Sequence, residues 1–140
     1  ANNGTLISPR AVEKIESNKG DVEHVKPEKT TQVITPRAAA QITEMMVNAV
    51  ENGEAKAFVP KGYRIAGKTG TAQIPVAGNY DPNKTIASFI GFAPANDPKF
   101  VMLVLFNEPT SSIYGSETAA PTFFEISKEI FNYLGIAPNN

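Results

Sequence analysis

The sequence predicts an α+β fold in which helices pack on an antiparallel sheet. Apolar residues recur at helical spacing in two segments, 35–53 and 119–134. Two runs of strand-forming residues, 85–93 and 99–106, are joined by the short turn 94–98, which implies antiparallel pairing. With 140 residues, 41% of them hydrophobic, the chain is long enough to bury one core without cross-links.

Residues 1–34 are predicted to be extended segments that include a small hairpin. Residues 10–16 alternate imperfectly between apolar and polar side chains, and residues 17–21 contain the Asn, Gly and Asp that tight turns favour. Residues 22–25 can then return as a partner strand, whereas residues 30–33 read as a linker. We therefore divide the chain into residues 1–34 and residues 35–140, which carry the helices and three main strands.

Two amphipathic helices are predicted from their start and stop signals. Thr35 and Pro36 supply a capping hydroxyl and a proline at the first helical position, and Asn52-Gly53 supplies a left-handed stop. The second helix, 119–134, ends at Gly135. The apolar stripe of the first helix consists of Ile42, Met45, Met46, Ala49 and Val50, and the inward face of the second of Phe123, Ile126, Ile130, Phe131 and Leu134.

Three strands are expected in the second part of the chain. They cover residues 63–66, 85–93 and 99–106, and the last two are apolar on both faces, so we expect both of their faces to be covered. Residues 70–83 and 107–117 read as long irregular loops, which often carry function.

Charge and composition exclude several classes of function. Thirteen Lys and Arg balance 14 Asp and Glu without clustering, so nucleic acid is not an expected partner. There is no Cys, hence no disulfide and no thiolate metal site, and the sequence shows no metal-ligand cluster. The longest apolar run, 100–106, is too short to cross a bilayer. The chain begins without Met or signal sequence, and we expect it to be a piece of a longer protein.

One segment, 67–73, has the composition of a functional motif, and two interpretations compete for it. Residues 62–69 satisfy the phosphate-loop pattern of Gly, four residues and Gly-Lys-Thr. That loop requires a helix directly after it to receive the anion, and the Gly and Pro residues within 70–82 prevent a long helix. Asn107 also stands where an acid would be needed to hold magnesium after the later apolar strand. Nucleotide binding is therefore the remote alternative.

The second interpretation takes Lys68-Thr69-Gly70 as the motif that accompanies Ser-x-x-Lys in penicillin-recognising enzymes. Around it, the chain resembles the C-terminal part of the transpeptidase domain of class B penicillin-binding proteins. The resemblance extends over nearly the whole chain, in blocks that follow the family's order: 1–6, 35–53, 63–73, 86–94, 100–106, Tyr114-Gly115 and 119–123.

The resemblance implies roles for the residues of this motif. Lys68 is expected to bind the terminal carboxylate of a stem peptide ending in D-Ala-D-Ala, or that of a β-lactam, with the hydroxyls of Thr69 and Thr71. The backbone N–H of Thr71 is expected to form half of an oxyanion hole. Gly70 is expected to leave room for the bound peptide, which would lie alongside as an added strand, and Gln73 to line the cleft.

The catalytic nucleophile is missing from the sequence. None of the seven serines is followed by Lys at the third position, and no Ser-x-Asn has a plausible context, so we expect the chain alone not to be acylated. By resemblance, the upstream half of the domain carries those groups and the strands that flank residues 100–106. That bare edge would then be covered by the upstream half or by self-association. The family also implies the extracytoplasmic side of a bacterial membrane and no cofactor. The alternative is a non-catalytic substrate-recognition module.

Overall fold

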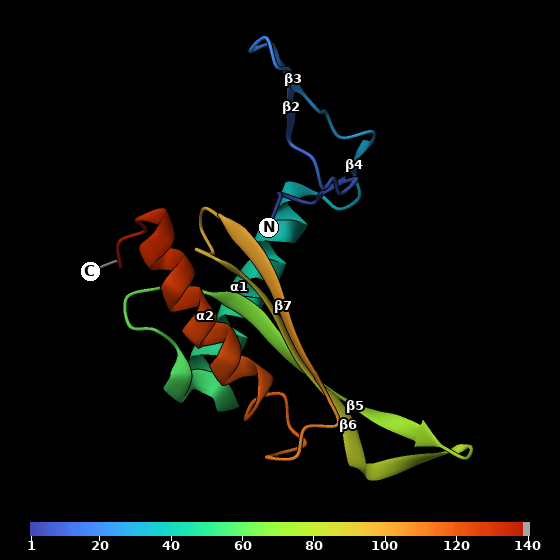
Figure 1. The fold of residues 1–140 in the computed structure, drawn as a ribbon. Coiled ribbons are helices and arrows are strands. Elements are labelled where there is room, and N and C mark those ends of the chain that lie inside the picture. The colour runs from blue at the N-terminus through green and yellow to red at the C-terminus, as the bar shows by residue number, and fades with distance from the viewer. Residues whose placement is uncertain (139–140) are drawn as a thin grey trace. The chain divides into compact units, whose positions relative to one another are not determined.

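A computed structural model describes residues 1–138 as an α+β structure in two compact units. One unit comprises residues 2–40, and the other comprises residue 1 and the chain from residue 41 onward. The division falls within the first helix, and each unit is described separately. The predicted fold class is confirmed by the helices and antiparallel sheets of these units (Figure 1).

The first unit contains two small antiparallel pairs of strands. β2 (Lys14–Glu16) and β3 (Val22–His24) form the predicted hairpin. β1 (Thr5–Ile7) pairs with β4 (Thr30–Gln32), so the prediction of a linker at residues 30–33 was wrong. The strand that pairs with residues 30–32 lies about two dozen residues earlier in the chain, and a local sequence pattern does not predict pairing over that separation.

The second unit is built on a three-stranded antiparallel sheet in the order β5 (Ala66–Val76), β6 (Asn79–Ala93) and β7 (Phe100–Asn107). The helix α2 (Ala119–Leu134) packs on one face of this sheet (Figure 1). The helix α1 (Pro36–Asn52) and the short 3-10 helix η1 (Glu54–Phe58) precede β5 in the chain. None of the helices within residues 1–138 is long and apolar enough to cross a membrane.

The predicted irregular loop at residues 70–83 is wrong, because β5 and β6 continue as a long hairpin. Its turn consists of Ala77 and Gly78, both with positive φ, as in the two-residue turns that suit hairpins. A register shift after Gln73 leaves residues 82–84 outside the pairing, so Pro82 lies in a bulge. Prolines and glycines that signal a loop in isolation are thus accommodated at the turn, the bulge and the sheet edge.

The helix ends match their local signals in part. The Thr35 hydroxyl accepts a hydrogen bond from the N–H of Ala38, and Gly135 ends α2 with φ of 65°, both as predicted. Gly53 follows α1 as predicted, but its φ of −82° is not left-handed. A Cβ there would lie 2.2 Å from the carbonyl oxygen of Ala49, so close contact is what favours glycine at this position.

The inward faces of both helices differ from the predicted stripes. In α2, Phe123 and Phe131 are buried as expected, but Ile126 and Leu134 are exposed and Phe124 and Ser127 are buried in their place. In α1, Met45 and Ile42 are exposed, and the buried residues are Val47 and Val50. In both helices the buried face lies about one residue position away from the predicted stripe. Periodicity alone does not determine the buried face this finely, because apolar residues also lie at the edges of each stripe.

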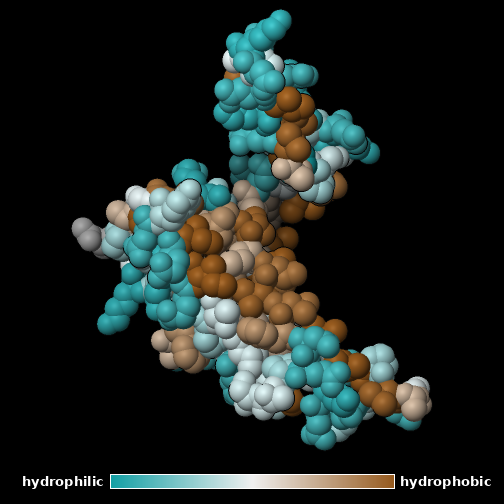
Figure 2. All heavy atoms as spheres, viewed as in Figure 1, coloured by the Kyte–Doolittle hydropathy of each residue, from teal (hydrophilic) through white to brown (hydrophobic). Residues whose placement is uncertain are grey.

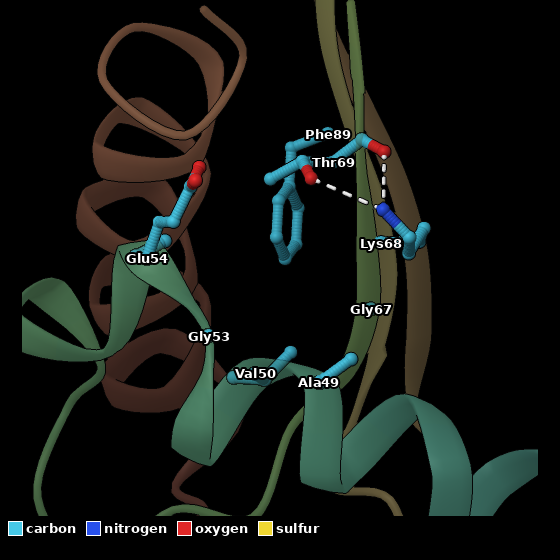
Figure 3. A pocket seen from close by; sticks show the side chains of 9 residues that line it. Ala49, Val50, Gly53, Glu54, Gly67, Lys68, Thr69 and Phe89 are labelled. Carbon is cyan, nitrogen blue, oxygen red and sulfur yellow. Dashed lines mark hydrogen bonds between the residues drawn. The ribbon is translucent and has the colours of Figure 1, made fainter.

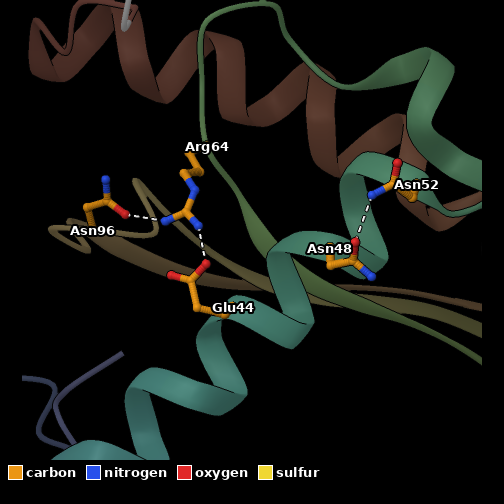
Figure 4. Close-up of polar contacts among 5 residues, drawn as sticks. All are labelled: Glu44, Asn48, Asn52, Arg64 and Asn96. Atoms are coloured by element: carbon orange, nitrogen blue, oxygen red, sulfur yellow. Dashed lines mark hydrogen bonds and ion pairs between the residues drawn. The ribbon is translucent and has the colours of Figure 1, made fainter.

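The main core lies between α2 and the sheet. Phe89 of β6 contacts Phe123 and Phe124, with ring centroids 4.6 Å and 5.3 Å away, and Tyr63 stacks on Phe131. On the opposite face, α1 contributes Val47 to a smaller cluster whose members are Val47, Ala66, Phe92 and Ala95. The α1 helix is also tied to the sheet by Arg64, which binds both Glu44 of α1 and Asn96 of the β6–β7 turn (Figure 4).

The rest of that opposite face is uncovered within the described chain, which corrects the expectation that the last two strands are covered on both sides. Side chains alternate between faces along a strand, and cross-strand pairing aligns Ile90 with Leu103. The side chains of this open apolar face are between 47% and 61% exposed and consist of Ile90, Val101, Leu103 and Leu105. Figure 2 shows apolar side chains gathered over β7.

Candidate functional site

The Lys68-Thr69-Gly70-Thr71 motif lies inside β5, which is an edge strand of the sheet. On one side β5 pairs with β6, where Lys68 faces Ile90 and Thr69 faces Phe89. On its other side β5 has no strand partner among residues 1–138. A peptide in extended conformation can therefore pair with β5 along this free edge.

Lys68 provides a positive charge that no acidic side chain within residues 1–138 neutralises. Its side chain is exposed, and it forms no ion pair with any residue of the described chain, 1–138. The ammonium instead donates to the carbonyl oxygen and the hydroxyl of Thr69, at 3.1 Å and 3.3 Å. The cation and the hydroxyl are thereby held next to each other on the strand, in an arrangement that suits an anionic ligand.

A cavity of about 350 Å³ borders this part of β5 (Figure 3). Gly67, Lys68 and Thr69 form one wall, and the end of α1 together with the start of η1 forms the opposite wall. The ring of Phe89 lies between these walls and is only 2% exposed overall. The cavity therefore joins an apolar floor to the polar edge of the motif.

The Thr71 side chain contacts the segment between β7 and α2. Its hydroxyl oxygen accepts a hydrogen bond of 3.1 Å from the N–H of Gly115. Gly115 is buried, and a Cβ at this position would lie 2.5 Å from the carbonyl oxygens of Gly70 and Ser88. Only glycine permits such a close approach of one backbone to another, so this contact connects the two sequence blocks around residues 71 and 115.

Gly70 lies beside the Ser88 side chain of the neighbouring strand. A Cβ at Gly70 would lie 2.6 Å from the hydroxyl oxygen of Ser88 on β6. Rotation of the Ser88 side chain relieves this contact, so the space that a bound peptide needs stays the predicted reason for glycine at this position. Gln73 is exposed at the last pair before the register shift and does not line the cavity beside Lys68. Its role in a cleft stays a prediction.

Several residues of the site were not found from the sequence. Phe89, Ala49 and Val50 line the cavity, and Gly115 binds Thr71, although each is distant from the motif in the chain. The antiparallel register, which sets Thr69 opposite Phe89, would be the signal for the first of them. From the sequence, Gly115 was identified only as part of a block that resembles the family, and its contact with Thr71 was not predicted.

The geometry excludes the phosphate-loop interpretation. The residues after Lys68-Thr69 continue as strand β5 as far as Val76, so no helix follows the motif. Without a helix N-terminus the backbone N–H groups do not converge on a phosphate. Within the described residues, 1–138, there is also no group of three or more His, Asp or Glu side chains that could hold a metal ion.

Comparisons with known proteins agree with the second interpretation of the motif. Residues 1–128 match the family model of the penicillin binding protein transpeptidase domain. The chain is 39% identical over 140 residues to the stage V sporulation protein D of Bacillus subtilis, covering 98% of the chain and 22% of that protein. It is 38% identical over 112 residues to the probable peptidoglycan D,D-transpeptidase PenA of Neisseria flavescens, covering 79% of the chain and 28% of that protein.

A solved structure supports the same assignment. The peptidoglycan synthetase of Bifidobacterium adolescentis aligns with 100% of the chain at a TM-score of 0.85 and 30% identity, and the chain covers 26% of it. The chain thus spans between about a fifth and just over a quarter of the length of these three proteins. The resemblance drawn from the motif and its flanking blocks is confirmed, and the chain belongs to the penicillin-binding protein transpeptidase domain family.

Proposed function

We propose that this chain forms the carboxylate-binding wall of a serine-type peptidoglycan D,D-transpeptidase that also binds penicillin. The observation that carries the proposal is the state of Lys68, an exposed cation on an edge strand that lacks an acidic partner within residues 1–138. Such a cation beside the Thr69 hydroxyl suits a ligand carboxylate, which a stem peptide ending in D-Ala-D-Ala and a β-lactam both possess.

The free edge of β5 supports a binding mode for the peptide. An extended stem peptide pairs with this edge through backbone hydrogen bonds, and its terminal carboxylate lies at Lys68, Thr69 and Thr71. A β-lactam carries its carboxylate to the same three groups. Gly70 has no side chain that would obstruct the ligand, and Gln73 contacts the ligand farther along the strand.

Thr71 has a second role in the proposed reaction. Its backbone N–H stabilises the oxyanion that develops when a serine attacks the carbonyl carbon of the penultimate D-Ala. Losing one such donor typically costs about 3–4 kcal/mol of transition-state stabilisation. The acyl group passes to the serine and D-Ala leaves; the amine of a second stem peptide then takes the acyl group and releases the serine.

The serine and its activating lysine are proposed to come from an upstream half of the transpeptidase domain. The 140 residues contain no Ser-x-x-Lys, so this chain supplies recognition and part of the oxyanion hole, not the nucleophile. The same absence supports the alternative of a non-catalytic recognition module, which would bind the same carboxylate without forming an acyl-enzyme.

The apolar face and edge of β7 support the need for a companion. Within the described part of the chain, 1–138, β7 is paired on one side only, and Leu103 and Leu105 are about half exposed. An apolar edge strand of this kind associates with another chain unless it is covered. The upstream half of the domain is the proposed cover, and self-association replaces it when that half is absent. Light scattering at high concentration tests this, and a clean monomer of the isolated chain contradicts it.

The place of action follows from the proposed substrate. Peptidoglycan stem peptides are cross-linked on the extracytoplasmic side of the bacterial membrane, and we place the enzyme there. No metal or organic cofactor is needed for serine acyl transfer, because the oxyanion hole and an activated serine supply the chemistry.

Labelling with a fluorescent penicillin tests the proposal in a complete transpeptidase domain that contains this chain. Lys68→Met is expected to lower the acylation rate constant roughly tenfold to a hundredfold, the value of a hydrogen bond to a charged group. The matched control is Lys99→Met, which removes a half-exposed lysine paired with Asp97 in the β6–β7 turn and should change the rate less than twofold. Equal labelling of the Lys68 variant and the parent contradicts the proposal.

The isolated chain tests the absence of the nucleophile, and the complete domain separates the two candidate functions. We expect it to form no adduct with the fluorescent penicillin that survives denaturation, since it lacks the nucleophile. If the complete domain is also unlabelled although it contains a Ser-x-x-Lys, the non-catalytic module is the better description.

A further inference from the structure

We propose that the main-chain segment 113–115 positions the Thr71 hydroxyl, so that its proton is directed toward a bound carboxylate. The proposal rests on the function proposed above and adds the group that orients one of its ligand contacts. The segment lies between β7 and α2 and touches β5 and β6 through backbone atoms of Gly115.

The hydrogen bond from Gly115 determines which way the Thr71 hydroxyl can donate. A hydroxyl has one proton to donate and two lone pairs to accept with. The N–H of Gly115 occupies an acceptor site of the Thr71 oxygen at 3.1 Å, so the hydroxyl proton must point elsewhere. Among residues 1–138 the Thr71 hydroxyl donates to no acceptor, and its side chain is exposed. The proton is therefore available to a ligand.

The segment that supplies this N–H is fixed on both sides. The hydroxyl of Thr85, a residue that is 1% exposed, donates to the carbonyl oxygen of Ile113 at 2.7 Å. The carbonyl oxygen of Gly115 accepts the N–H of Ala120, in the buried first turn of α2, at 2.8 Å. A Cβ on Gly115 would meet two backbone oxygens at 2.5 Å, so the segment lies directly against the sheet with no room for a side chain.

The Thr69 hydroxyl also accepts a hydrogen bond from the protein, but from a different donor. Its hydroxyl oxygen accepts from the Lys68 ammonium at 3.3 Å, which also leaves its proton free to point outward. Residues 69 and 71 are two positions apart on a strand, so both side chains lie on the same face. The motif thus presents a cation and two hydroxyl groups whose protons are free to donate to a ligand. This suits a carboxylate, which can only accept hydrogen bonds.

The test removes the anchor of the segment and leaves the ligand-binding residues intact. In a complete transpeptidase domain that contains this chain, Thr85→Val deletes the hydroxyl that holds Ile113, and Thr85→Ser retains it. Acylation rate constants are measured for benzylpenicillin and for its methyl ester, which has the same ring but no carboxylate. A change in the ratio of the two constants reports carboxylate recognition, whereas a general loss of folding lowers both together.

We expect Thr85→Val to lower the rate constant for the acid about tenfold and that for the ester less than twofold, as partial loss of a charge-assisted hydrogen bond would do. Thr85→Ser should restore the acid rate. In a Thr71→Val background, Thr85→Val should have no further effect on the ratio, because the hydroxyl through which it acts is gone. An equal loss for acid and ester, or additive effects of the two valine substitutions, overturns the proposal.

Two further measurements separate this proposal from the proposed function. Lys68→Met serves as reference: if it leaves the acid-to-ester ratio unchanged, the proposed carboxylate site itself is wrong. If it changes the ratio while Thr85→Val does not, only the positioning role fails. Hydrogen exchange of the Gly115 amide gives an independent result, since Thr71→Val should accelerate it and Thr71→Ser should not. Equal exchange in both variants overturns the Gly115–Thr71 contact.

Discussion

Replacing Phe89 by alanine should cost more stability than any other single truncation beside the site. The ring is 2% exposed, lies 4.6 Å from Phe123 and 5.3 Å from Phe124 between centroids, and stands opposite Thr69 on the neighbouring strand. Truncating a buried Phe to Ala costs about 3–5 kcal/mol from lost transfer energy and the cavity left behind. We expect about 4 kcal/mol, in the middle of that range, which includes the loss of the two aromatic contacts.

Urea unfolding followed by circular dichroism measures this change. With a slope of about 2 kcal/mol per molar urea, a loss of about 4 kcal/mol moves the midpoint down by about 2 M. Phe58→Ala is the matched control, because Phe58 is 45% exposed and its truncation should cost about 1 kcal/mol or less. If the two variants lose the same stability, the position of Phe89 in the core beneath the motif is wrong.

Two further predictions concern the strands and the charges around the site. Gly70→Ala should change stability by about 1 kcal/mol or less, because the one atom within 3 Å of its Cβ is the Ser88 hydroxyl oxygen, which rotation about χ1 moves away. Penicillin labelling of this variant should nevertheless fall, since the added methyl group takes space that the ligand needs; unchanged labelling would contradict a role of Gly70 beside the ligand. The Lys84 pKa is raised by its hydrogen bond and charge interaction with Glu108, at 3.0 Å. The stabilisation of the fold by this pair is present below the unfolded lysine pKa of 10.5 and is lost as pH rises through the higher folded pKa of Lys84. NMR titration should therefore give Lys84 a higher pKa in the parent protein than in the Glu108→Gln variant, which lacks the charge that raises it. Equal values in the two proteins would contradict this.

Local sequence signals correctly predicted those features that are determined by residues adjacent in the chain. The cap at Thr35 and the left-handed Gly135 are each determined by a few residues of chain, and both were found. The β5–β6 hairpin was missed because its pairing outweighs the loop signals of Pro75 and Pro82. A proline on an edge strand or in a bulge removes no hydrogen bond that the sheet needs, so it does not prevent the strand.

The motif itself was visible in the sequence, but its surroundings were not. Lys68 to Thr71 were identified by type and flanking blocks, whereas the cavity floor at Phe89 depends on the register of β5 against β6. The contact between Gly115 and Thr71 joins positions 44 residues apart and involves a backbone N–H, which no side-chain pattern encodes. The open face of β7 was missed because a strand that is apolar on both sides is usually covered on both.

A crystal structure of a complete transpeptidase domain containing this chain, acylated with benzylpenicillin, tests the central claim most directly. We predict that the carboxylate oxygens of the bound penicillin lie about 2.7–3.2 Å from the Lys68 ammonium and the hydroxyls of Thr69 and Thr71. A carboxylate that lies away from all three groups, with the penicillin bound elsewhere or in the opposite direction along β5, would contradict the account.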